Sequence, residues 1–544
     1  MIGLLPAAFG LLLAAAPAPA ERDPNALVEK ALGDLEAWDI KGAVRALDEL
    51  QQVDPTGAPA AYLRGRVLFE QGKYDESVGA YDEAGARANR AGASSSLKAA
   101  LAAEILNALR HDRQLAKATA NEVRSFAVHE SAHFVLRTKK GKDALLVPYA
   151  LEGLEKAYAA LTRDLGVAPE EKIRVEIYES AQALARVSPL TVAEIKASGT
   201  IALCKYNRLM ITTPRALIRG YPWVDTLTHE FAHFLVTKKG RGAVPIWLQE
   251  GLAKFLETRW RGAPGQAVDA QSVALLHRAA KTNTLIPFDR MHPSIAKLPT
   301  QEAAALAFAE VEAAIKLLFD RGGQAALTEL VAAMAAGFSD RQAVAQAYGK
   351  SFEAFEADWK KDVARPRGAV AARPRRQSRL VFKEDAKGRP ELAESGHIVD
   401  AEAKKAYRLG EILLARRRWA AAAIEYGRAR ARVKDAVPLL SRRYALACLQ
   451  IGKVDEALAA LVGATTTDPH DETAQALLAR VWLQRNELDK ARAALEAGIA
   501  VDPFDPDLHA TYVEVARRKG DAGLEKREKE ALRLSVHGSK GSHP

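Results

Sequence analysis

Residues 225–257 read DTLTHEFAHFLVTKKGRGAVPIWLQEGLAKFLE, and the interpretation of the whole chain depends on this stretch. His229 and His233 are four residues apart, so on a helix their imidazoles are separated by about 40° around the axis and about 6 Å along it. Both can then bind one tetrahedral metal ion. Glu230, beside the first histidine, can accept a proton from a metal-activated water. The stretch therefore predicts a metal centre with its own general base.

A third ligand follows on a second predicted helix. Pro245 can open this helix, which contains Glu250, 17 positions after His233. A histidine pair alone would be a weak match to a metal site, and the glutamate makes the pattern specific. Asp225, one helical turn before His229, can either orient the second nitrogen of that imidazole or face the dipole of the first turn.

The combination HExxH followed by WLxEGLA resembles the gluzincin metallopeptidases, in particular the peptidase MA-like group. WLQEGLA is also similar to the WLNEGFA of aminopeptidases, but no GxMEN-like strand is found. The resemblance implies an α+β zincin-like catalytic domain of the thermolysin or gluzincin type. It further implies that His229, His233 and Glu250 bind Zn²⁺ and that Glu230 is the catalytic base for hydrolysis of peptide bonds.

One position departs from the family pattern. A tyrosine is common in that family at a position like Phe308, in LAFAEVEAA, where its hydroxyl can stabilise an oxyanion. Phenylalanine cannot donate this hydrogen bond. Other residues could replace the tyrosine, although each is more often a packing or surface residue: Tyr206, Tyr221, His277 and His292.

A second HExxH motif competes with the first. His129, Glu130 and His133 form HESAH, and Glu152 follows in ALEGLEKAY. A zincin needs a sheet before its motif helix, because a strand edge holds extended substrate beside the metal. Only helical repeats precede HESAH, whereas three strand-like runs precede the later motif: Arg174 to Tyr178, Ile201 to Lys205 and Leu209 to Thr213.

The earlier motif is better explained as part of a strand. If residues 127–136 are extended, His129 and His133 are about 13 Å apart along the strand and Glu130 faces the other way. The family resemblance agrees, since peptidase MA-like domains commonly begin with a strand like HFVLR and a helix like residues 149–165. We therefore assign the metal centre to the later motif.

Both ends of the chain repeat at helical-repeat length. Ile40 and Tyr74 are 34 positions apart, and so are Asp468 and Asp502, each of which is followed by proline. These segments resemble tetratricopeptide repeats, about two before the catalytic domain and three or four after it. Each repeat buries its face only against its neighbours, so such arrays present extended surfaces for protein partners. A generic helical bundle is the alternative.

Composition and the N-terminus complete the prediction. LLPAAFGLLLAAA followed by Ala18-Pro19-Ala20 is typical of a secretory signal, so we expect an exported protein, periplasmic or extracellular, without a membrane span after signal removal. Cys204 and Cys448 fall in different predicted domains, which favours free thiols over a disulfide framework. Basic residues are concentrated in a stretch from Arg365 to Arg379 that has no aromatic residues interleaved, so we interpret it as a solvated linker and expect no nucleic-acid partner despite the net charge of +10.

We therefore expect an exported zinc-dependent peptidase, with an endopeptidase favoured over an exopeptidase, whose repeats recruit a protein substrate or partner. The runner-up is a repeat scaffold with a degenerate, non-hydrolytic metal-binding domain. The predicted organisation is a signal peptide over 1–20, N-terminal repeats over 21–115, the catalytic domain over 122–365, a basic linker over 366–397, C-terminal repeats over 398–534 and a disordered tail over 535–544.

Overall fold

The computed structural model describes residues 23–90, 99–262, 268, 270–365, 380–385, 395, 398–433 and 437–537. The chain divides into two compact units, Met1–Gln114 and Leu115–Pro544. The predicted signal segment lies outside the described residues. Among the helices that are described, none is both long and apolar enough to cross a membrane.

The first unit contains two helix pairs. They are α1 (Pro24–Glu36) with α2 (Ile40–Val53), and α3 (Ala58–Glu70) with α4 (Tyr74–Arg90). The second helices of the two pairs begin at Ile40 and Tyr74, which are 34 residues apart, as the sequence predicts. The next helix, α5 (Ala99–Val123), continues past the predicted end of the repeats at residue 115.

A mixed five-stranded sheet begins the central part of the second unit. Its strands are β1 (Phe126–Glu130), β2 (Phe134–Lys139), β3 (Ile173–Tyr178), β4 (Ala202–Lys205) and β5 (Arg208–Thr212). Their order is β1-β2-β3-β5-β4, with β2, β3 and β5 parallel and both outer strands antiparallel. All three strands predicted before His229 are therefore present. Every residue of β3 and β5 is buried, as expected for inner strands, and the buried charges of Glu176 and Arg208 pair at 3.2 Å.

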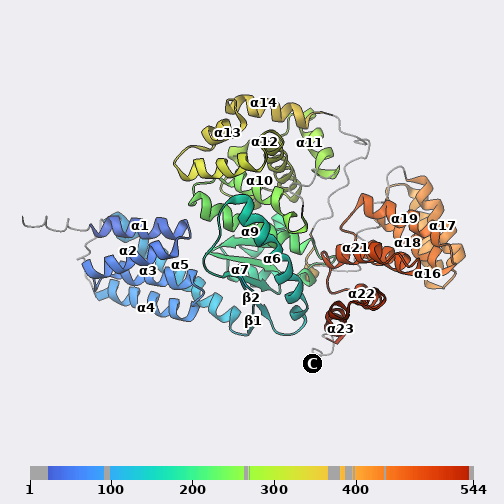
Figure 1. Cartoon of the computed structure of the whole chain (residues 1–544), viewed down its shortest axis with the longest axis horizontal. Helices are drawn as coiled ribbons and strands as arrows, with labels where there is room; N and C mark the ends of the chain where they lie inside the picture. Colours follow the sequence, from blue (N-terminus) through green and yellow to red (C-terminus); the bar gives the residue numbers. More distant parts are fainter. Residues whose placement is uncertain are drawn as a thin grey trace, which may run out of the picture. The chain divides into compact units, whose positions relative to one another are not determined.

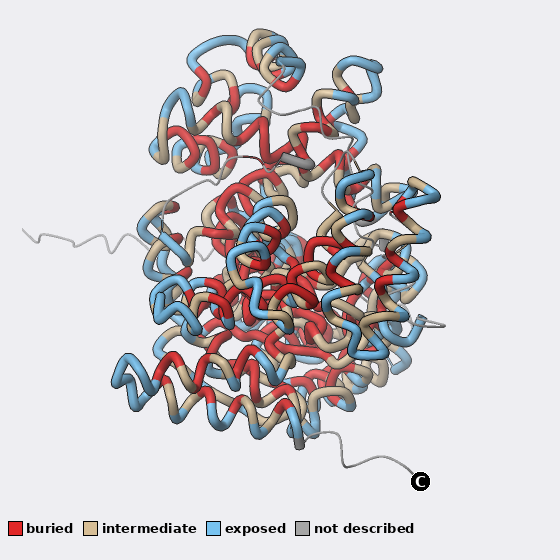
Figure 2. Tube along the Cα trace, turned by 90° about the vertical axis from the view of Figure 1, so that its right-hand side faces the viewer, coloured by how far each residue is buried: buried red, intermediate tan, exposed pale blue. Residues whose placement is uncertain are grey.

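Helices cover this sheet and extend beyond it. They are α6 (Leu146–Leu165), α7 (Ala181–Arg186), α8 (Val192–Ser198), α9 (Trp223–Gly240), α10 (Ile246–Leu256), α11 (Ala270–Thr282), α12 (Gln301–Ala335), α13 (Asp340–Tyr348) and α14 (Phe352–Val363). α6 and α9 pack against each other and against the sheet (Figure 1). Along the outer helices, buried and exposed segments alternate within each turn (Figure 2). This is the pattern of amphipathic helices, which pack one face on the core and expose the other.

Close packing of α10 on α12 explains the glycine in the EGLA sequence. A Cβ atom on Gly251 would lie 2.7 Å from Cγ1 of Ile315 and 2.9 Å from the carbonyl oxygen of Val311. A side chain at this position would push α12 away from the residue that follows Glu250. The glycine therefore lets α10, which carries Glu250, pack tightly into the core.

Four helix pairs form the C-terminal repeats. They are α16 (Ala401–Ala415) with α17 (Trp419–Arg432), α18 (Pro438–Gln450) with α19 (Val454–Thr467), α20 (Glu472–Gln484) with α21 (Leu488–Ile499), and α22 (Pro506–Lys519) with α23 (Ala522–His537). The first helices of the last three pairs begin at residues 438, 472 and 506, at the predicted period of 34. The last helix reaches residue 537, so the predicted tail over 535–544 begins too early.

Part of the predicted linker is packed. Within 366–397 the structure describes 380–385 and residue 395, and Phe382 is only 2% exposed. It forms an isolated β-bridge with Leu217, and the backbone N–H of Ile218 donates to the carbonyl of Val381 at 3.0 Å. Phe382 anchors this short segment against the central part of the second unit, because an aromatic side chain gains by burial, while Val381 and residues 383–385 remain exposed.

A buried carboxyl group gives a test of this core. Glu310 on α12 is fully buried, and its two oxygens accept the backbone N–H of Ile286 at 2.9 and 3.2 Å. Burial raises the pKa of Glu310 from 4.5 to about 8. Between these two values the folded state binds a proton that the unfolded chain has released. The free energy of unfolding should therefore fall as pH rises through this window.

We predict that Glu310→Gln, which keeps an acceptor for Ile286 but cannot ionise, raises the melting temperature by a few degrees at pH 8 and has little effect at pH 5. Thermal unfolding followed by circular dichroism at both pH values measures this difference. Glu329→Gln, at an exposed position of the same helix, is the control and should gain nothing at either pH. A gain for Glu310→Gln that does not depend on pH would contradict the assignment.

Candidate metal centre

Two consecutive helices position the candidate ligands. α9 begins directly after Pro222 and carries His229 and His233 on one face, and α10 carries Glu250. The side chains of the two histidines are 12% and 13% exposed, and that of Glu250 is 17% exposed. The predicted ligands are thus shielded from bulk water but not sealed from a substrate.

The three ligand atoms form a compact triangle. Nε2 of His233 is 3.1 Å from Nε2 of His229, and Oε2 of Glu250 is 3.4 Å from His229 Nε2 and 3.3 Å from His233 Nε2. A tetrahedral zinc ion with bonds of about 2.0–2.1 Å has ligand atoms about 3.3 Å apart. Among the described residues, this is the one group of His, Cys, Asp and Glu side chains with such spacing. The donor set therefore fits the ion.

The charges of the site also fit a cation. Burial alone would lower the pKa of His229, but the carboxylates of Glu250 and Glu257 outweigh it and raise that pKa to about 10. Burial would raise the pKa of Glu250, yet the two imidazoles hold it well below its usual range. The arrangement attracts positive charge strongly, and a divalent cation would neutralise the buried carboxylates.

A carboxylate that the sequence analysis missed faces the back of His229. Oε2 of Glu257, the C-cap of α10, lies 3.3 Å from Nδ1 of His229. Glu257 follows Glu250 by seven residues, two helical turns, so both carboxylates lie on the same side of α10. This seven-residue spacing is the sequence signal that could have identified Glu257. Glu257 also pairs with Lys254. Burial would raise the pKa of Glu257, but Lys254 and His229 outweigh burial and lower that pKa to about 2.

Asp225 does not have the orienting role considered for it. Its carboxylate accepts the indole N–H of Trp260 at 2.7 Å and two hydrogen bonds from Arg261 at 2.7 and 2.9 Å. The expectation that it orients His229 is wrong, because the chain after α10 returns past the start of α9 and takes up this carboxylate. Burial raises the pKa of Asp225 to about 6, and Arg261 opposes that shift.

The side chain of Glu230 points toward β4, an outer strand of the sheet. Its side chain is buried and hydrogen-bonds to the backbone of Cys204 on β4. Burial raises the pKa of Glu230, while positive charge on the imidazoles of His233 and His229 opposes that shift. A buried carboxylate beside the ligand set, with its pKa raised by burial, suits a general base.

Comparison with protein families agrees with this geometry. Residues 153–365 match the model of the peptidase MA superfamily, and residues 28–93 and 449–512 match tetratricopeptide repeat models. The chain carries a peptidase MA domain flanked by tetratricopeptide repeats. No curated protein sequence matches the chain.

Solved structures give only distant matches. Yeast LTA4 hydrolase is 13% identical, with 75% of this chain and 66% of that chain covered at a TM-score of 0.30. A structure titled "MamA RS-1 ArsTM double mutant" is 18% identical, with 28% of this chain and 89% of that chain covered at a TM-score of 0.25.

Phe308 lies beside the candidate ligands. Its ring centre is 6.3 Å from that of His229, so the peptidase MA domain presents an aromatic ring without a hydroxyl to the metal centre. The hydroxyl of Tyr221 donates instead to the carbonyl of Thr212.

The earlier HExxH motif forms part of a β-hairpin. His129 and Glu130 lie on β1, and His133 directly precedes β2, where it stacks on Tyr158 and contacts Glu155. Glu130 pairs with Lys172. Glu152 forms ion pairs with Lys156 and Arg527. The structure therefore separates these four residues, as the sequence predicts, although His133 lies in the turn between β1 and β2 rather than on one strand with His129, and Glu152 lies on α6.

The role of Glu257 can be tested by metal affinity. We predict that Glu257→Gln weakens zinc binding by at least tenfold, because it removes the negative charge that orients and polarises His229. Asp225→Asn should have a much smaller effect, since its partners are Trp260 and Arg261. Competition with a chromophoric chelator measures both constants. A larger loss of zinc affinity for Asp225→Asn than for Glu257→Gln would show that Glu257 does not orient His229 through its Nδ1 atom.

Proposed function

We propose that this chain is an exported zinc-dependent peptidase, acting as an endopeptidase, whose repeats recruit a protein substrate or partner. The observation that carries this proposal is the triangle of His229, His233 and Glu250 with its tetrahedral spacing and with Glu230 beside it. The family match of the domain supports the same chemistry. The apolar N-terminal sequence ending Ala18-Pro19-Ala20 supports export.

Each residue has a defined part in this proposal. His229, His233 and Glu250 would hold the zinc ion, which when bound would polarise a peptide carbonyl and lower the pKa of water. Glu230 would take the proton from the attacking water and pass it to the nitrogen of the leaving amine. Glu257 would keep His229 in the orientation that directs its Nε2 toward the ligand triangle.

The sheet edge supports binding of an extended chain. β4 is one of the two outer strands, pairs with β5 alone in the described sheet, and lies against α9. A substrate segment could add to its open edge through main-chain hydrogen bonds, which read no particular side chain. Such binding suits cleavage within a polypeptide better than capture of a terminus.

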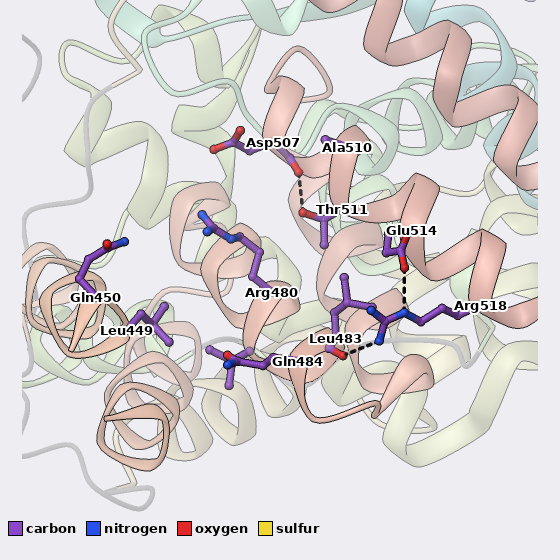
Figure 3. Close-up of a pocket in the computed structure, with 11 residues that line it drawn as sticks. Leu449, Gln450, Arg480, Leu483, Gln484, Asp507, Ala510, Thr511, Glu514 and Arg518 are labelled. Atoms are coloured by element: carbon purple, nitrogen blue, oxygen red, sulfur yellow. Dashed lines mark hydrogen bonds and ion pairs between the residues drawn. The ribbon is translucent and has the colours of Figure 1, made fainter. Parts of the chain in front are cut away.

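A groove in the C-terminal repeats supports recruitment. It has a volume of about 680 Å³ and is lined by side chains of α18, α20 and α22 (Figure 3). Gln450 and Gln484 offer amide groups, and Arg480 extends between the helices toward Asp507. Leu449 and Leu483, which are partly exposed, supply apolar surface. A peptide segment needs this combination of main-chain partners and apolar contact.

A second candidate function is a repeat scaffold with a non-hydrolytic metal domain. Phe308 favours it, because the ring facing His229 lacks the hydroxyl that would stabilise an oxyanion. The intact ligand triangle and the buried Glu230 favour the peptidase. Metal content and peptide hydrolysis distinguish the two.

We predict about one zinc ion per purified chain, and loss of most of it in Glu250→Ala, which removes a ligand. Elemental analysis after dialysis measures the metal, and digestion of a mixed peptide substrate measures activity. Zinc without hydrolysis under any condition would favour the scaffold. Full zinc retention by Glu250→Ala would remove Glu250 from the site.

The two HExxH motifs predict opposite outcomes for matched substitutions. Glu230→Gln should lower peptide hydrolysis by several orders of magnitude while zinc stays bound, since it removes the base but no ligand. Glu130→Gln, on the β1 strand, should leave the rate within a few fold. Initial rates for the two variants at equal zinc content provide the comparison, and the reverse ranking would show that the earlier motif is catalytic.

A further inference from the structure

The first turn of the metal helix is completed by a distant part of the chain. The first N–H groups of any helix lack partners within it, and the N-cap Pro222 provides no side-chain hydrogen bond. Instead, the backbone N–H of Trp223 donates to the carbonyl of Ala500 at 3.2 Å. The indole N–H of Trp223 donates to the carbonyl of Ile499 at 3.0 Å. The two acceptors are the last residue of α21 and its C-cap, where the chain leaves α21 for α22.

The approach of this loop requires a glycine. Gly220 has a φ of +65°, and a Cβ atom there would lie 2.3 Å from the carbonyl oxygen of Val501. Next to it, the backbone N–H of Tyr221 donates to that same carbonyl at 3.1 Å. Any side chain at residue 220 would therefore push the loop away from the start of α9. Residues 499–501, which we call the capping loop, and residues 220–223 fit together closely.

A second buried contact fixes the helices that follow the capping loop. Glu528 on α23 is fully buried and accepts the hydroxyl of Tyr149 on α6 at 2.8 and 2.9 Å. It also contacts Nδ1 of His509 on α22 at 2.7 Å, while Nε2 of His509 contacts the carbonyl of Pro503 at 2.7 Å. The last repeat is thus attached both to α6 and, through the capping loop, to α9.

We propose that the capping loop positions the metal helix, with Trp223 and Gly220 as positioning residues for His229 and His233. This inference rests on the metal centre proposed above. His229 lies six residues, about 9 Å, after Trp223 on one rigid helix, so fraying or tilting of the first turn moves both imidazoles relative to Glu250. The last C-terminal repeat then supports the metal centre, and removing the C-terminal repeats would weaken metal binding.

The coupling must act in both directions. If the capping loop favours the arrangement that binds zinc, zinc must favour the docked state of the capping loop by the same factor. Hydrogen exchange measures the loop directly and does not depend on catalysis. In the full chain, we expect zinc to slow amide exchange over 499–512 and over the first turns of α9. Residues 24–53 in the N-terminal repeats are the internal control and should not change.

Variants of two glycines isolate the contact. Gly220→Ala should weaken zinc binding by about tenfold or more and abolish the zinc-dependent protection of 499–512. Gly452→Ala is the matched control, because Gly452 has a φ of +76° but nothing within 4 Å of its Cβ position. It carries the same backbone strain without the contact, and zinc binding should be unchanged.

A milder pair of variants covers the case in which Gly220→Ala does not fold. Trp223→Phe removes the indole donor but keeps an aromatic ring, and should weaken zinc binding by a few fold. Trp482→Phe, on α20 in the same repeats, should not. Equal zinc affinity within both pairs, or zinc binding without protection of 499–512, would overturn the positioning role. If the unaltered chain binds no zinc, the metal centre itself is refuted, and this inference with it.

Discussion

The attraction between two imidazoles and the carboxylates around them is the constraint on which the site depends. His229 and His233 share a buried corner with Glu230, Glu250 and Glu257. Neutral imidazoles would leave several buried negative charges without compensation, and such charges are costly in a protein interior. The corner is stable only with positive charge inside it. A metal cation would supply that charge, and this is the physical basis of the function proposed here.

The surrounding packing holds these groups at ligand distance. α9 rests on the sheet and on α6, while Gly251 lets α12 press on α10 immediately after Glu250. The two ligand helices are therefore fixed by different neighbours. Because interiors are closely packed, a small displacement of either helix would alter the triangle of ligand atoms. This explains why short EGLA-type sequences combine a ligand with a residue that has no side chain.

The repeats at the C-terminal end share structure with the metal centre. α22 lines the groove that offers Gln450, Gln484 and Arg480 to a peptide, and the loop before it caps α9. A segment bound in the groove would therefore contact an element that also supports the ligand helix. Recruitment and metal binding would then be linked through one helix.

The sequence alone determined the local features. Four-residue spacing on α9, the glutamate 17 positions later and the 34-residue repeat all depend on helix geometry and on contacts between neighbours in the chain, so they can be read from residue order. The strand-like runs before His229 likewise predicted β3, β4 and β5, which favoured the correct motif over HESAH. What the tertiary structure decided involves residues far apart in sequence. Glu257 rather than Asp225 faces His229 because of how α10 crosses α9, and Trp223 is capped from residues 499 and 500. Backbone carbonyls carry no residue identity, so no sequence pattern could reveal which loop would complete the metal helix.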